Sequence, residues 1–148
     1  MTKISDRIPG YTYGTAEAAR SPVLTRELDD LKISAGFTEE DPRYLRLAGE
    51  VLADQTKRIV GHWRGGIISG IPNLARHSLT PEGNAIPEYT ASSNLRFEQW
   101  ILDTCLRQYD QAWIDYQHEV ALRHTSVKKN KVDGVQSTPY AAAGCYRI

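Results

Sequence analysis

Two stretches of helical periodicity between Arg96 and His124 constrain this chain more than any other feature. In each stretch, aromatic and apolar side chains recur every three or four residues, as they do along the buried face of an α-helix. Tyr109-Asp110 lies between the stretches and supplies an aspartate that can cap the second helix. No alternation of the kind that indicates β-strands occurs in the sequence, so we expect an all-α fold.

A short helix and an N-terminal arm are expected upstream. Thr25, followed by acidic and apolar residues at helical spacing, predicts a helix within Pro22–Ala35 that ends at Gly36. Residues 1–21 contain the string IPGYTYG, whose glycines and proline interrupt regular structure while its tyrosines remain able to pack. We therefore expect residues 1–21 to form an extended arm that lies on the body of the domain.

The longest helix is expected to begin near Thr38, where acidic residues favour a helix N-terminus and Pro42 is tolerated in the first turn. An apolar stripe from Tyr44 to Trp63 predicts one continuous helix of about five turns. Ile71-Pro72 should close it, because the residue before a proline is pushed out of the helical region. Asn73–Pro87 is rich in turn residues and predicts a loop.

Composition excludes several classes of protein. The chain has 148 residues, a length that suits one domain, and 18 basic side chains balance 18 acidic ones. A net charge of zero gives no attraction to nucleic acid or to an anionic membrane, and no apolar stretch is long enough to span a bilayer. We expect a cytoplasmic protein without a signal sequence, in which Cys105 and Cys145 are free thiols.

His124 ends the second aromatic stripe and is the first candidate for chemistry. Counting back from it in steps of four, four and three reaches Val120, Tyr116 and Trp113, so the imidazole should point toward the apolar interior. A histidine at this place can also simply complement the helix dipole. A buried imidazole needs a partner for each nitrogen, and haem iron can be one of them. His118 lies on a different face, which argues against a zinc site.

Five motifs together resemble the archaeal and bacterial protoglobins, single-domain relatives of the globin-coupled sensors. They follow one another in the same order and at nearly the same spacing from about residue 8 to residue 139. The motifs are IPGYTYG at 8–14, AGEVLADQ at 48–55, RFEQWILDT at 96–104, YDQAWIDYQHEVALRH at 109–124 and KKNKVDGV at 128–135. The resemblance implies a globin-like helical sandwich that binds haem b, iron protoporphyrin IX, with the N-terminal arm helping to bury it.

The resemblance also implies which residues surround the haem. The matching positions are His124 as the proximal iron ligand, Tyr116 and Val120 beside it, and Trp63 and Phe97 in the distal wall. Arg96, next to Phe97, can reach a haem propionate through a charge-assisted hydrogen bond, although an exposed arginine is an equally good interpretation.

Two departures from the family pattern stand out. Arg64 replaces a tyrosine that usually follows the distal tryptophan, and Gly66 replaces a bulky aromatic residue. Turned inward, Arg64 would add a donor for O2 or favour an anionic ligand, whereas turned outward it would leave the pocket without a hydroxyl donor. Protoglobins continue into two further helices where this chain has a divergent tail at 140–148, so we expect exposed apolar faces around Trp100 and Trp113.

The sequence therefore predicts a haem-binding globin that reversibly coordinates O2, CO or NO, for oxygen binding or gas sensing, with a homodimer as one way to cover the exposed faces. The alternative is a haem-free helical interaction or remnant protein whose motifs survive from ancestry. Catalysis at an open iron ranks last because the sequence offers no dedicated acid and base pair. We expect a protein that is not an enzyme.

Overall fold

The computed structural model describes residues 7–125, 128, 134 and 135. These residues contain six α-helices. The helices are α1 (Thr25–Ser34), α2 (Asp41–Leu52), α3 (Thr56–Gly61), α4 (Pro72–Ala75), α5 (Pro87–Leu106) and α6 (Gln111–Arg123). Within these residues the only strand-like pairing is an isolated bridge between Leu79 and Ala85. The all-α prediction is confirmed. The tail expected at 140–148 lies outside the described residues.

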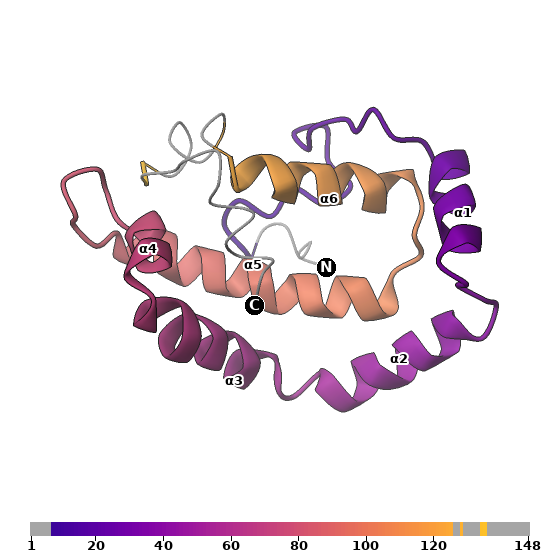
Figure 1. Ribbon diagram of the computed structural model, residues 1–148, viewed down its shortest axis with the longest axis horizontal. Coiled ribbons are helices and arrows are strands. Elements are labelled where there is room, and N and C mark those ends of the chain that lie inside the picture. Colours follow the sequence, from indigo (N-terminus) through magenta and orange to yellow (C-terminus); the bar gives the residue numbers. More distant parts are fainter. Residues whose placement is uncertain (1–6, 126–127, 129–133, 136–148) are drawn as a thin grey trace.

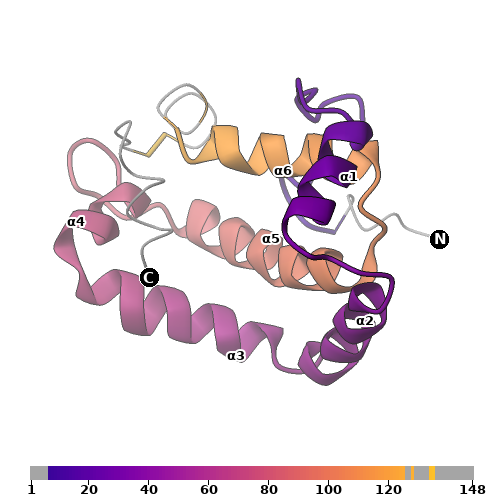
Figure 2. The ribbon, with the colours of Figure 1, turned by 45° about the vertical axis from the view of Figure 1, so that its right-hand side comes forward.

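Helix α5, with 20 residues, runs between α6 on one side and α3 on the other (Figure 1). Both α2 and α3 pack against α5, and α1 lies at the end of the molecule that holds α2 and the start of α6 (Figure 2). The arm, from residue 7 to the start of α1, passes along α6 (Figure 1). Of the helices that the structure describes, none is both long and apolar enough to cross a membrane.

Gly49 allows α2 to approach α5 closely. A Cβ atom at this position would lie 2.6 Å from Cδ2 of Leu106 and 2.9 Å from Cβ of Cys105, closer than real contacts allow. Only glycine therefore fits at this crossing. Gly49 belongs to the AGEVLADQ motif, so its place in that motif has a packing reason.

The prediction of one long helix was wrong, because the chain bends between α2 and α3. The backbone N–H of Gln55 donates to the carbonyl of Leu52 at 2.8 Å, one residue short of the α-helical partner. The side-chain amide of Gln55 donates to the carbonyl of Val51 at 2.7 Å and so takes that partner's place. This competition between side chain and backbone ends α2 and turns the chain into α3.

Beyond α3 the helical winding changes twice. His62–Ile67 form a π-helix and Ile68–Gly70 a short 3₁₀-helix, in a segment where three glycines weaken the preference for α-helix. Ile71 is extended (φ −113°, ψ 103°), as expected before a proline. The loop expected at Asn73–Pro87 is partly helical, because Pro72 occupies a first-turn position of α4 and Arg76–Ser78 continue as a 3₁₀-helix.

Apolar side chains remain exposed on α2. Tyr44, Leu47 and Val51 are 53%, 56% and 58% exposed, so the first part of the predicted stripe does not form a buried face within the described residues. Trp100 and Trp113 are half-buried rather than bare.

A buried hydrogen-bond network holds the arm on α5. The Tyr11 hydroxyl donates to Oδ2 of Asp103 at 2.5 Å, and this carboxyl is only 2% exposed. Oδ1 of Asp103 accepts from Nε of Arg107 at 2.7 Å and from Nε2 of Gln99 at 2.9 Å. Both oxygens of this buried carboxylate are therefore hydrogen-bonded, with the arm supplying one donor.

Replacing Tyr11 by phenylalanine tests this anchor. The change leaves the aromatic ring in place but removes one donor from a buried carboxylate, so the free energy of unfolding should fall by about 1–3 kcal/mol. Urea denaturation measures the difference. Tyr44→Phe, at a position 53% exposed, is the matched control and should change stability little. Equal stability of the two variants would contradict the role assigned to Tyr11.

Candidate functional site

A cavity of about 300 Å³ opens between α5, the end of α6 and the segment that joins α3 to α5. Its volume lies at the small end of the range of ligand pockets. The seven side chains that the sequence indicated all line this one cavity: Trp63, Arg64, Arg96, Phe97, Tyr116, Val120 and His124. The structure therefore brings together residues from three separate segments of the chain.

Helix α6 presents Tyr116, Val120 and His124 to the cavity, since residues four apart lie on one face. Its start follows from Asp110, whose carboxylate accepts from the backbone N–H of Trp113 at 3.0 Å, as predicted. Tyr116 is 3% exposed, and burial raises its pKa to about 12, so its hydroxyl stays protonated at neutral pH.

Two tyrosines of the arm pack against the ring of Tyr116. The rings of Tyr11 and Tyr13 meet it edge to face, with ring centroids 5.2 and 5.3 Å away. Such pairs stabilise a fixed ring orientation beyond the area that they bury. The arm thus shapes the cavity wall through Tyr116.

His124 follows the last turn of α6 and is oriented by its own helix. Its Nδ1 lies 2.7 Å from the carbonyl oxygen of Val120. A carbonyl oxygen can only accept, so the ring proton belongs on Nδ1, and in the neutral imidazole the lone pair is then on Nε2. This is the tautomer that a metal ligand bound through Nε2 requires.

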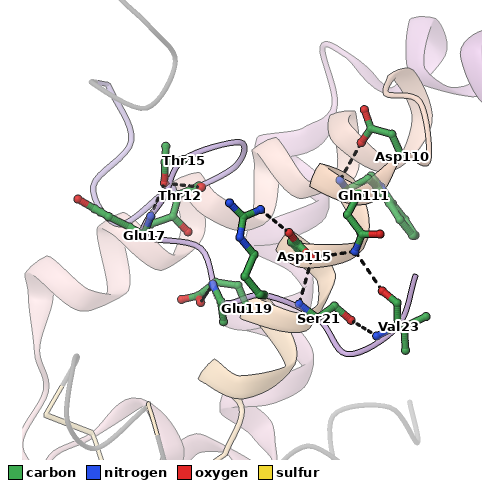
Figure 3. A network of polar contacts seen from close by, with 12 residues as sticks. Thr12, Thr15, Glu17, Ser21, Val23, Asp110, Gln111, Asp115 and Glu119 are labelled. Carbon is green, nitrogen blue, oxygen red and sulfur yellow. Dashed lines mark hydrogen bonds and ion pairs between the residues drawn. The ribbon is translucent and has the colours of Figure 1, made fainter. Parts of the chain in front are cut away.

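A neighbouring face of α6 carries two buried carboxylates, Asp115 and Glu119, which are 3% and 1% exposed. Asp115 accepts from the backbone N–H of Ser21 at 3.0 Å and from Arg20 at 2.8 Å, and Gln111 also donates to it (Figure 3). Glu119 accepts from the backbone N–H of Ala19 at 2.9 Å. Both side chains therefore tie α6 to the arm.

The wall across from α6 comes from α5 and from the π-helix. Phe97 and Trp100 of α5 lie with ring centroids 6.1 Å apart, and Nε1 of Trp100 donates to Gln117 of α6 at 2.9 Å. Trp63 and Arg64 come from the π-helix. The guanidinium carbon of Arg64 lies 5.8 Å from the centroid of Phe97, so this side chain takes the inward pose.

Arg123 is a cavity residue that sequence reasoning missed. It follows Tyr116 by seven residues and Glu119 by four, so helical spacing alone places it between the two faces of α6. Its Nε donates to Glu119 at 3.1 Å, while its buried Nη1 has no hydrogen-bond partner. His77, Tyr89 and Ser93 also line the cavity, and no periodicity in the sequence indicated His77.

Arg96 and Arg123 converge on Gly10 of the arm. A Cβ at Gly10, whose φ is +74°, would lie 2.8 Å from Nη1 of Arg96 and 3.2 Å from Nη1 of Arg123. Nη1 of Arg96 donates to the carbonyl of Pro9 at 2.8 Å. Among the described residues that line the cavity, none is acidic, so its polar groups favour an anionic or electron-rich ligand.

The protoglobin family model matches residues 24–143. The chain belongs to the protoglobin family. The all-α, globin-like fold agrees with this assignment, and the match covers every element that lines the cavity, while most of the arm behind Tyr116 lies outside it. A search of the curated proteins finds no match. Protoglobins are globins, so membership implies haem as the general class of cofactor.

Acidification should loosen the contact between α6 and the arm in this protoglobin. Burial raises the pKa of Glu119, but Lys128, the N–H of Ala19 and Arg123 together outweigh it, so the pKa lies below its ordinary value of 4.5. A carboxyl with a lowered folded-state pKa stabilises the fold fully above its unfolded-state pKa, and this contribution is lost as the pH falls through the folded-state value.

We therefore expect Glu119→Gln to be less stable than the wild type at neutral pH and the difference to shrink as the pH falls below 4.5. Urea denaturation at neutral pH and at about pH 3 measures both differences. Glu50→Gln, an exposed change on α2, is the control and should stay close to the wild type at both pH values. A Glu119→Gln difference that does not depend on pH would contradict the linkage.

Proposed function

We propose that this protoglobin binds haem b through His124 and reversibly coordinates O2, CO or NO on the opposite face, for oxygen binding or gas sensing. The observation that carries the proposal is the arrangement of His124 in the cavity, with Nδ1 directed at the carbonyl of Val120 and the aromatic wall across from it. That hydrogen bond favours the tautomer that can bind iron through Nε2.

The residues present fit a haem. Trp63, Phe97, Trp100 and Tyr116 offer apolar surface for a flat macrocycle. The two haem carboxylates need cations, and the pair Arg96 and Arg123 lies at the edge where the arm passes. The buried Nη1 of Arg123, which lacks a hydrogen-bond partner, is the kind of group that a carboxylate would satisfy.

In this proposal each residue has a distinct part. His124 holds the iron, and the carbonyl of Val120 fixes the orientation of the ring and raises its basicity. Trp63 and Phe97 restrict the access of water to the opposite face. A bound haem would supply an iron that binds small gases reversibly, and the imidazole of His124 and the polarity of the pocket would tune that binding.

Removal of the imidazole tests the proposal. Purified protein mixed with haemin should give a Soret band of a histidine-ligated haem, and His124→Ala should lose it. His118→Ala is the matched control, because His118 stands on the same helix but does not line the cavity. Equal bands in the two variants would overturn the assignment of His124. A wild type that shows no band and forms oligomers on gel filtration would favour the haem-free alternative.

A second test concerns the carboxylates. Arg96→Leu should weaken haemin binding by about tenfold, the loss expected for one charge-assisted hydrogen bond. Binding of iron protoporphyrin IX dimethyl ester, which has no free carboxylate, should be the same in wild type and variant. Quenching of tryptophan fluorescence reports both affinities, since Trp63 and Trp100 line the cavity. An equal loss for the two compounds would show that Arg96 acts through packing rather than charge.

A further inference from the structure

Resting on the proposed haem site, we infer that Arg64 makes this pocket selective for small anions, such as azide, nitrite or fluoride, as ligands of the ferric iron. The structure points to this ligand class through three features of Arg64. They are the burial of its Nε, the lack of an acidic partner in the cavity wall, and its position opposite the helix that carries His124.

The Nε of Arg64 is buried and has no hydrogen-bond partner. A buried N–H of a charged group that donates to nothing is costly, because it has lost its water without gaining an acceptor. The contact with Phe97, at 5.8 Å from the ring centroid, holds the guanidinium in the cavity wall but supplies no acceptor. An anion within the cavity would remove this cost.

The other two arginines of the cavity each donate a hydrogen bond to an acceptor of the protein. Nε of Arg123 donates to the buried carboxylate of Glu119, and Nη1 of Arg96 donates to the carbonyl of Pro9. Both of these side chains are directed to the arm. Because none of the described lining residues is acidic, the cavity wall contributes no counter-charge to Arg64.

Arg64 and His124 line one cavity but come from elements on different sides of α5. The π-helix that carries Arg64 continues α3, and α3 and α6 lie on opposite sides of α5 in both ribbon views (Figures 1 and 2). A ligand bound to the iron on the side away from His124 would therefore face the part of the cavity wall that carries Arg64.

A guanidinium discriminates between ligands by charge. It donates charge-assisted hydrogen bonds to an anion and gains less from a neutral ligand of similar reach. Azide and fluoride should therefore bind more tightly than in a pocket that lacks the arginine, whereas imidazole, a neutral ligand, should not. Arg64 acts here as a specificity-determining residue and leaves the bond between His124 and the iron unchanged.

The test measures equilibrium binding to the ferric protein loaded with haemin. Arg64→Leu should raise the Kd for azide and for fluoride by about 10- to 100-fold, as the loss of a charge-assisted hydrogen bond predicts. The Kd for imidazole should rise little or fall. Arg64→Lys keeps the charge and should recover part of the anion affinity. Shifts of the Soret band on titration give each Kd.

Arg46→Leu, an exposed change on α2, is the matched control and should leave all three Kd values unchanged. Far-UV circular dichroism checks that each variant is folded. A Soret band that depends on His124, together with equal azide affinity in wild type and Arg64→Leu, would overturn this inference and leave the haem site standing. The lack of any such band in the wild type would overturn the haem site and this inference with it.

Discussion

The rotation of α6 about its own axis is the constraint on which the site depends. Asp115 and Glu119 are buried against the arm and accept its backbone N–H groups, so this face of the helix cannot turn away without the loss of both hydrogen bonds. Residues one position further along the helix then face the cavity. Polar contacts on one side of α6 thereby decide where His124 points.

The other wall depends on irregular helix geometry. The bend at Gln55 separates α2 from α3, and the π-helix His62–Ile67 then presents Trp63 and Arg64 to the cavity. An extra residue in a helical turn re-aims the side chains that follow it, which is a frequent device at functional sites. The glycines of this segment lower its α-helical stability at the place where it lines the cavity.

Periodicity was enough to predict the cavity face of α6 and the aspartate cap that starts the helix, because both are local properties of the sequence. Periodicity did not predict the helix break at Gln55, because the break comes from one side-chain amide that competes with the backbone and leaves the apolar pattern unchanged. Periodicity also missed the partners of Asp115 and Glu119, which lie 94 to 100 positions away along the chain.

Arg123 could have been predicted as a cavity residue, since its spacing from Tyr116 places it at the edge of the same face. The shared motifs, rather than periodicity, connected Trp63 and Phe97 with His124, and all three side chains line one cavity.

A crystal structure of the protein grown with haemin would test the central claim most directly. The account predicts the iron bound to Nε2 of His124, with Nδ1 still donating to the carbonyl of Val120 and the porphyrin between α6 and the wall that carries Phe97. A haem bound through another residue, or seated outside this cavity while His124 keeps its present place, would contradict it.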